Sequence, residues 1–365
     1  MSRTYSDDRT VWRDGCKYTL DTQRCHIEIY CVFKLDFDPN IYSNYDGCES
    51  DGIYFNGGYH KPRALIFKNV MGPDLSFNDY DARDIVSIDI SENNYETLPT
   101  IGQLKSLKFF NISNNNLTSA DLYNEIELKS LEGIDFSHNN ICDIVTNSNG
   151  NAYVFNTLIN LTLSYNKIRE VKDNLFMDFH NLRRLDISHN HIASIGAHTF
   201  EGISQLSVLQ LSHNNIIDVN FSLIRFTELE ELYLNNNNIQ KILFNNFQNL
   251  HNLKILDLSY NSIVLIEDNA LQNILLLKKI DLSNNILTNI SKIVFSKNLL
   301  LNDVNLSHNS LTELPQGLFK GKNISMFSIE ENYLGGTVKQ GMFEGLKLNK
   351  VLNLRNQALK RIEQY

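Results

Sequence analysis

Apolar and polar positions along this chain repeat in a unit of about two dozen residues. Each unit reads apolar-x-x-apolar-x-apolar-x-x-Asn, as at Leu182, Leu185, Ile187 and Asn190. The Leu-x-Leu alternation predicts a short strand, because successive side chains on a strand point to opposite faces. The closing residues recur at steps of 22 to 27, at Asn93, Asn115, Asn139, Asn166, Asn190, Asn214, Asn237, Asn261, Asn285, Asn309, Asn332 and Gln357.

The second half of each unit is equally regular. Apolar residues fall two and five places after the asparagine, and an aromatic follows at about ten places. This pattern predicts a stacked phenylalanine spine in the core, formed by Phe176, Phe200, Phe247, Phe295, Phe319 and Phe343, with Ile224 and Leu271 in the same slot. The closing asparagine amide has donors and an acceptor for buried backbone groups, so we expect a hydrogen-bonded ladder along the repeats.

A period near 24 residues with this motif indicates a leucine-rich repeat solenoid. The predicted fold is an α/β repeat horseshoe. It has a parallel β-sheet on the concave face and irregular, 3-10 or short helical segments on the convex face. We expect about twelve repeats over residues 63–365, the last incomplete. The end at Tyr365 carries no predicted cap, so we expect either a longer chain or a homo- or hetero-dimer partner at that end.

The first 62 residues carry no repeat and hold four of the five cysteines. A small cysteine-rich segment before a solenoid predicts an N-terminal cap. Disulfides are the expected state, with three possible pairings, and free buried thiols are the alternative. The wide, irregular spacing disfavours a zinc site. The disulfide candidates are Cys16, Cys25, Cys31 and Cys48.

Composition and charge exclude several classes of partner. The 365 residues are 42% hydrophobic and carry a formal net charge of −9, which favours neither nucleic acid nor an anionic membrane. No apolar run reaches the roughly 18 residues of a membrane span. Residues 1–11 contain no signal-peptide core. Glycosylation, which needs the secretory pathway, has the candidates Asn111, Asn116, Asn160, Asn220, Asn289, Asn305 and Asn323.

Catalytic motifs are absent from the sequence, so we expect no enzyme, no cofactor and no metal site. There is no P-loop, no nucleophile elbow and no HExxH helix. A stripe of histidine, tyrosine and asparagine precedes the closing asparagine. Edge packing is the expected role of this stripe, and metal binding or pH sensing by His189 and His213 are the alternatives.

The outward residues of the predicted sheet form the candidate binding surface. Charged residues alternate there in basic and acidic patches, which suits a protein partner of complementary pattern. An ordinary solvated face is the alternative. The binding candidates are Asp135, Arg183, Arg184, Asp186, Gln210, Glu230, Glu231, Tyr233, Asp257, Lys278, Lys279 and Asp281.

Two sets of residues carry a family resemblance. The repeats LRRLDISHNHIASIGAHTF and LKILDLSYNSIVLIEDNAL resemble the typical 24-residue leucine-rich repeat of animal extracellular proteins. The stretch from Cys16 to Cys48, followed by ALIFKNV, resembles the heads of insect leucine-rich immune proteins, which are related in architecture to Toll-like receptors. This chain departs from them in having no signal sequence, C-terminal cysteine cap, coiled coil or transmembrane segment.

The resemblance implies a non-enzymatic recognition module at the cell surface or outside the cell. Family members bind protein partners or pathogen-derived ligands, so an innate-immune or receptor-ectodomain role is expected. Cell adhesion is an alternative within the same class. A cytoplasmic leucine-rich repeat scaffold or regulator is the alternative if the N-terminal cysteines are reduced.

Overall fold

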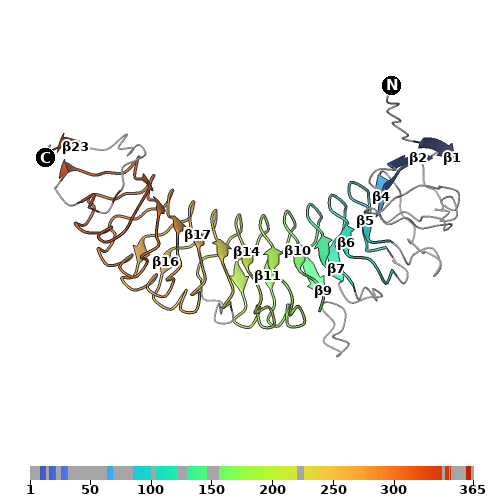
Figure 1. Cartoon of the computed structure of the whole chain (residues 1–365), viewed down its shortest axis with the longest axis horizontal. Helices are drawn as coiled ribbons and strands as arrows, with labels where there is room; N and C mark the ends of the chain where they lie inside the picture. Colours follow the sequence, from blue (N-terminus) through green and yellow to red (C-terminus); the bar gives the residue numbers. More distant parts are fainter. Residues whose placement is uncertain are drawn as a thin grey trace, which may run out of the picture. The chain divides into compact units, whose positions relative to one another are not determined.

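The structure is a computed structural model of the whole chain. It describes residues 9–13, 16–21, 26–31, 64–68, 85–99, 104–121, 130–145, 156–219, 226–338, 342–344, 346 and 359–362. The chain divides into two compact units, unit 1 (Met1–Lys167) and unit 2 (Ile168–Tyr365). Both units are solenoids of stacked parallel strands, and Figure 1 shows the coils of each lying side by side.

Unit 1 begins with antiparallel strands and continues with parallel ones. Strands β1, β2 and β3 pair antiparallel, and β3 then pairs parallel with β4. A separate two-stranded sheet joins β7 and β9. The strand bounds are β1 Arg9–Arg13, β2 Cys16–Asp21, β3 His26–Cys31, β4 Ala64–Lys68, β5 Ser87–Asp89, β6 Phe109–Asn111, β7 Ser119–Asp121, β8 Gly133–Asp135, β9 Asp143–Val145 and β10 Asn160–Thr162.

Unit 2 repeats one parallel three-residue strand per coil. These strands are β12 Arg184–Asp186, β14 Val208–Gln210, β15 Glu231–Tyr233, β17 Ile255–Asp257, β19 Lys279–Asp281, β20 Asp303–Asn305 and β21 Met326–Ser328. Small two-stranded parallel sheets follow the turns, formed by β11 Glu170–Val171 with β13 Ser194–Ile195, β16 Lys241–Ile242 with β18 Leu265–Ile266, and β22 Gly336–Val338 with β23 Leu359–Ile362. The described residues contain no helix, and turns occupy the remainder of each coil.

The core of each coil is formed by the apolar positions of the repeat. Leu185 and Ile187 are 1% and 0% exposed, whereas Asp186 between them is half-buried. Since a strand alternates its side chains, this arrangement places one side chain of each strand in the core and two on the outer face. The predicted strands and their inward positions are confirmed.

The closing asparagines form the expected ladder. Asn237 accepts a hydrogen bond from the backbone N–H of Ile216 at 3.0 Å, one coil earlier. Its Nδ2 donates to the carbonyls of Leu211 at 2.9 Å and Leu234 at 3.0 Å. Asn214, Asn261, Asn285, Asn309 and Asn332 make equivalent bonds. Each amide therefore satisfies buried backbone groups in two successive coils.

The residue before each closing asparagine has a left-handed backbone. Its φ lies between 51° and 58° in every described repeat from Glu92 to Glu331. Residues other than glycine rarely adopt this conformation, and asparagine and histidine are enriched among those that do. The histidine, tyrosine and asparagine stripe seen in the sequence therefore marks a turn that every coil makes.

The phenylalanine spine is largely confirmed and includes two unforeseen members. Phe176 stacks on Phe200 at 6.1 Å between ring centroids, and Phe295 stacks on Phe319 at 6.2 Å. Phe226 follows Phe200 at 5.3 Å, and Phe179 meets Phe176 edge-on. Phe247 and Leu271 are buried as expected, whereas Phe343 is only half-buried. Ile224 lies outside the described residues.

Several predicted features lie outside the described residues. These are Cys25, Cys48, Asn220 and Gln357. The residues beyond Ile362 belong to the same group, so the predicted dimer contact at the C-terminal end stays a prediction, as does the role of residues 1–62 as a cap.

Candidate functional site

The sheet face of unit 2 is the surface formed by the outward residues of its seven parallel strands, with the residue that precedes each. It contains two parallel rows. The strand-start row comprises Arg183, Arg184, Ser207, Val208, Glu230, Glu231, Lys254, Ile255, Lys278, Lys279, Asn302, Asp303, Ser325 and Met326. The strand-end row comprises Asp186, Gln210, Tyr233, Asp257, Asp281, Asn305 and Ser328.

The backbone register aligns these rows across the sheet. Arg184 lies opposite Val208, which in turn lies opposite Glu231. Tyr233 lies opposite Asp257, which lies opposite Asp281. All the binding candidates named from the sequence therefore share one face, apart from Asp135, which occupies the corresponding position on β8 of unit 1.

Several charges in the strand-start row are neutralised within the face. Lys254 pairs with Glu230 at 2.6 Å, and Lys279 lies 3.8 Å from Asp303. The hydroxyl of Tyr233 donates to Glu231 at 2.9 Å. These bonds join strands or residues of the same face, so the groups are held in place before any ligand arrives.

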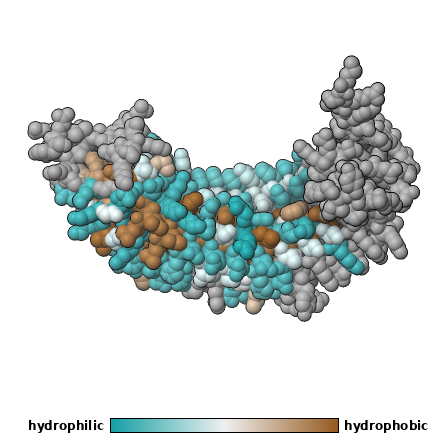
Figure 2. All heavy atoms as spheres, viewed as in Figure 1, coloured by the Kyte–Doolittle hydropathy of each residue, from teal (hydrophilic) through white to brown (hydrophobic). Residues whose placement is uncertain are grey.

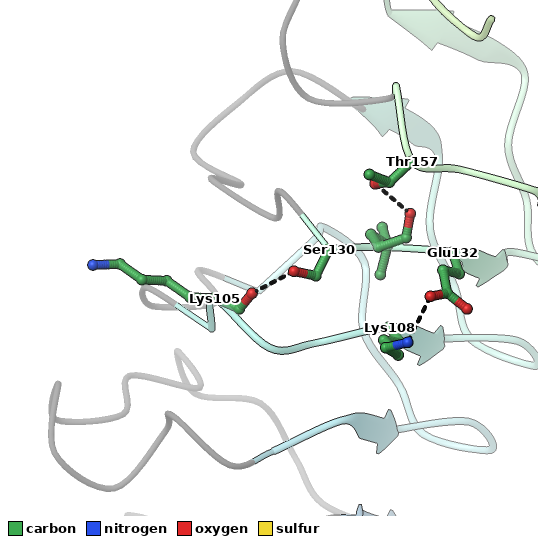
Figure 3. A network of polar contacts seen from close by, with 6 residues as sticks. Lys105, Lys108, Ser130, Glu132 and Thr157 are labelled. Carbon is green, nitrogen blue, oxygen red and sulfur yellow. Dashed lines mark hydrogen bonds and ion pairs between the residues drawn. The ribbon is translucent and has the colours of Figure 1, made fainter. Parts of the chain in front are cut away.

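The same kind of pairing occurs in unit 1. Lys108 and Glu132, which precede β6 and β8, form an ion pair at 2.7 Å and point toward one another in Figure 3. Beside them, the hydroxyl of Ser130 donates to the carbonyl of Lys105 at 2.7 Å. Exposed pairs of this kind contribute little stability. Their effect is to neutralise the charges of Lys108 and Glu132 on this part of the surface.

Three cations of the strand-start row remain without such a partner. No ion pair joins Arg183, Arg184 or Lys278 to any residue that the structure describes, and all three side chains are exposed. Arginine is enriched among residues that dominate binding energies in protein interfaces. These cations are the groups of the face most available to an external anion.

The strand-end aspartates have a structural role that the sequence analysis missed. Asp186 Oδ1 accepts from the backbone N–H of Ser188 at 2.9 Å and from its hydroxyl at 2.6 Å. Asp257 and Asp281 hold Ser259 and Ser283 in the same way, and Asp135 accepts from the N–H of Ser137. The recurring Asp-x-Ser spacing in the sequence indicates this turn-closing role. One carboxylate oxygen thus closes the turn after the strand.

Asp281 and Asp257 interact with further neighbours besides their serines. Asp281 Oδ2 accepts from the side-chain amide of Asn305 at 3.0 Å. Burial raises the pKa of Asp257, and the charge of Asp281 raises it further, against the lowering effects of the Ser259 bonds and of the Lys279 cation. Asp257 is therefore a partly desolvated carboxylate whose charge is not fully compensated within the face.

The centre of the face is apolar and aromatic. Val208 is buried, and Ile255 and Tyr233 are half-buried on the two following strands. Burial raises the pKa of Tyr233 to about 12, and its hydrogen bond to Glu231 adds to this shift. The phenol therefore stays protonated at physiological pH and its ring is fixed on the surface.

The glycosylation candidates differ in their surroundings. Asn116, Asn289 and Asn323 are exposed, and Asn160 is half-buried. Asn111 and Asn305 are also half-buried, and they accept from the N–H of Ser113 and Ser307, as the aspartates do. The serine that completes each of these sequons is therefore also the partner of a structural turn.

The histidine pair lies as the repeat predicts, and ring stacking favours the packing interpretation. His189 and His213 stack with centroids 3.9 Å apart, and in unit 1 His138 stacks on Tyr165 at 4.1 Å. Among the described residues no group of three histidine, cysteine or acidic side chains is placed to hold a metal ion.

Several large apolar side chains of unit 2 are exposed to solvent. Figure 2 shows apolar atoms gathered on one side of this unit. The most exposed of its large hydrophobic residues are Met177, Ile217, Phe244, Tyr260, Leu275, Leu299, Leu300 and Tyr333.

The part of the chain that the structure describes has no helix long and apolar enough to cross a bilayer.

Comparison with known families supports the repeat assignment. A family profile described as Leucine rich repeat matches residues 156–216 and 227–287. No relative is found among curated protein sequences.

Solved structures share the fold at low sequence identity. A leucine-rich repeat protein of Leptospira interrogans has 22% identity and a TM-score of 0.59, covering 81% of this chain and 79% of its own. Drosophila Toll, in its complex with Spatzle, has 18% identity and a TM-score of 0.65, covering 94% and 51%. TLR13, in its complex with ssRNA13, has 19% identity and a TM-score of 0.54, covering 83% and 54%.

A stacked parallel sheet with an open, charged face defines a protein-interaction solenoid, a class that is typically non-enzymatic. The chain contains leucine-rich repeats, and its fold resembles the leucine-rich repeat folds of Toll and TLR13. It spans about half the length of these two structures.

Proposed function

We propose that this chain is a recognition module of the extracellular leucine-rich repeat type that binds a protein partner through the sheet face of unit 2. The observation that carries the proposal is the unpaired cationic pair Arg183 and Arg184, on a face where Lys254 pairs with Glu230 and Lys279 with Asp303. A fixed aromatic ring at Tyr233 lies two strands away. Arginine and tyrosine at the centre of a surface are typical of binding hot spots.

Toll and TLR13 support a receptor-ectodomain or innate-immune role. Toll was solved with Spatzle, in a complex described as a hub in Drosophila development and innate immunity, and TLR13 was solved with single-stranded RNA. The net charge of −9 disfavours a nucleic acid ligand for the present chain. A protein, either an endogenous partner or a pathogen-derived one, is the ligand we propose.

A charge-reversal comparison tests the proposed surface. The Arg183→Glu/Arg184→Glu variant is expected to lose a partner recovered by affinity capture, with its affinity reduced about tenfold or more. The control Lys292→Glu/Lys297→Glu makes the same change in net charge at exposed residues away from the sheet face. Biolayer interferometry measures both. Equal losses in the two variants, or no loss in either, would remove the sheet face as the binding surface.

An intracellular scaffold is the second candidate, because one observation favours it. Cys142 is a free, exposed cysteine, and exposed free thiols are uncommon in oxidising compartments. Intact mass with and without reduction and deglycosylation separates the two cases. A gain of about two daltons per disulfide together with loss of sugar supports the extracellular assignment. An unchanged mass refutes it and supports the scaffold.

A further inference from the structure

The unpaired charges of the sheet face are unevenly distributed between its two rows. After the internal pairs of Glu230 and Asp303 are removed, the free cations belong to the strand-start row, at Arg183, Arg184 and Lys278. The carboxylates that hold the turns belong to the strand-end row, at Asp186, Asp257 and Asp281. Within the described residues, the strand-start row is therefore a net basic edge, with three unpaired cations and the carboxylate of Glu231, which accepts from the Tyr233 hydroxyl. The charged residues of the strand-end row are all aspartates, and this row is the acidic edge.

The dimensions of this arrangement suit an α-helix. Arg183 and Asp186 are three residues apart on an extended segment, about 10 Å, which matches the 10–12 Å diameter of a helix with its side chains. Ile255 in the strand-start row and Tyr233 in the strand-end row, both half-buried, supply apolar surface for the buried stripe of an amphipathic helix.

The repeat distance also favours a helix over an extended strand. Neighbouring strands are about 4.8 Å apart, so β12 and β19 are separated by four steps, about 19 Å. A helix lying across the strands advances about 5.4 Å per turn, and the accumulated mismatch over four steps is about 2.4 Å. In an extended partner, residues on the same face are about 6.7 Å apart. Over the same four strand spacings, the mismatch between partner and sheet would be about 7.6 Å.

We propose that the sheet face of unit 2 docks a partner helix across strands β12 to β19. The helix carries carboxylates on the flank over Arg183, Arg184 and Lys278, and lysine or arginine on the flank over Asp186, Asp257 and Asp281. This inference rests on the proposed function and specifies the chemistry of the partner. The partly desolvated Asp257 gains a compensating charge in the complex.

Two helical peptides of equal composition test the proposal on the full chain. In the segregated peptide, of about 16 residues so that it spans the 19 Å, glutamates lie on one flank and lysines on the other. In the mixed isomer both charges occur on both flanks. Fluorescence anisotropy is expected to show the segregated peptide binding about tenfold or more tightly. Added salt should reduce this preference. Equal affinities, or no binding of either peptide, overturn the proposal.

Variants of each edge show which residues cause the preference for the segregated peptide. Asp257→Asn/Asp281→Asn removes two charges and keeps the turn bonds, because Asn305 already holds Ser307 through an amide oxygen. This variant and Arg183→Glu/Arg184→Glu should each abolish most of the preference. The controls are Asp268→Asn/Glu313→Gln and Lys292→Glu/Lys297→Glu, all at exposed positions, and they should retain it. Circular dichroism confirms that each variant is folded.

The sheet-face site and the helix arrangement on it can be refuted separately. A natural partner that is lost with the arginine variant and unaffected by the aspartate variant contradicts the helix arrangement and leaves the sheet face as the binding surface. A partner unaffected by either variant contradicts both proposals. Loss of that partner with both variants, but with neither control, supports both.

Discussion

Replacing one closing asparagine should destabilise two coils together. Asn285 is buried, accepts from the N–H of Ile263 at 2.9 Å, and donates to the carbonyls of Leu258 at 3.0 Å and Leu282 at 3.1 Å. In Asn285→Ala the Ile263 N–H loses its hydrogen-bond acceptor. The two carbonyls keep one other amide partner each, from Asn261 and Asn309.

The magnitude follows from these contacts. A buried N–H without an acceptor costs about 1–3 kcal/mol, and weakening two carbonyl bonds raises the total to about 2–4 kcal/mol. A domain of about this size loses roughly 2–4 °C of Tm per kcal/mol, so the expected fall is about 5–15 °C. Asn285→Asp should be at least as damaging at neutral pH, because a carboxylate oxygen would face the two carbonyls. It should recover partly at acid pH, where the carboxyl is protonated and donates again.

Thermal unfolding by circular dichroism measures the change, and hydrogen exchange locates it. The amide of Ile263 should exchange faster in Asn285→Ala than in the wild type, along with its neighbours in the same coil. The exposed Asn245 provides the matched control, because its replacement by alanine should change stability by less than about 0.5 kcal/mol. A loss below about 1 kcal/mol for Asn285→Ala, or an equal loss for Asn245→Ala, would refute the role assigned to the ladder.

Three further predictions follow from the structure. Phe200→Ala should cost about 3–5 kcal/mol in chemical denaturation by leaving a cavity in the spine, and the exposed Phe244→Ala should not. Asp257→Asn should raise the Tm at neutral pH. Because the pKa of Asp257 is raised in the folded state, its ionised carboxylate destabilises the fold at neutral pH. The gain in Tm from Asp257→Asn should therefore vanish in acid, where this carboxyl is protonated. Non-reducing peptide mapping should link Cys16 to Cys31, which are Cα partners across β2 and β3, and another pairing would contradict this.

The sequence alone was sufficient for the architecture, because the repeat encodes it many times. The inward positions, the asparagine ladder and most of the spine follow from the period, and the structure confirms them. Phe226 shows where the pattern was insufficient. It falls outside the regular slot, in the coil where Ile224 occupies that slot, yet its ring packs against Phe200. Such contacts depend on which side chains fill the core at close-packed density. A periodic pattern of apolar positions does not specify this.

The candidate face was also predictable as a set of residues, but the state of each charge was not. The sequence placed Arg183, Glu230 and Lys278 on one face without showing which of them are paired. Pairing depends on side-chain distances between coils that are more than twenty residues apart, such as Lys254 with Glu230 at 2.6 Å.

The period of the chain determined the solenoid, because alternation and spacing act locally and are repeated in every coil. The tertiary structure decided what each outward residue does. It shows that Asp186 closes a turn with one carboxylate oxygen, and that the cations Arg183 and Arg184 remain unpaired among the described residues. The physical reason is that hydrogen bonds and ion pairs require atoms within a few ångströms, a distance that only the stacking of coils sets.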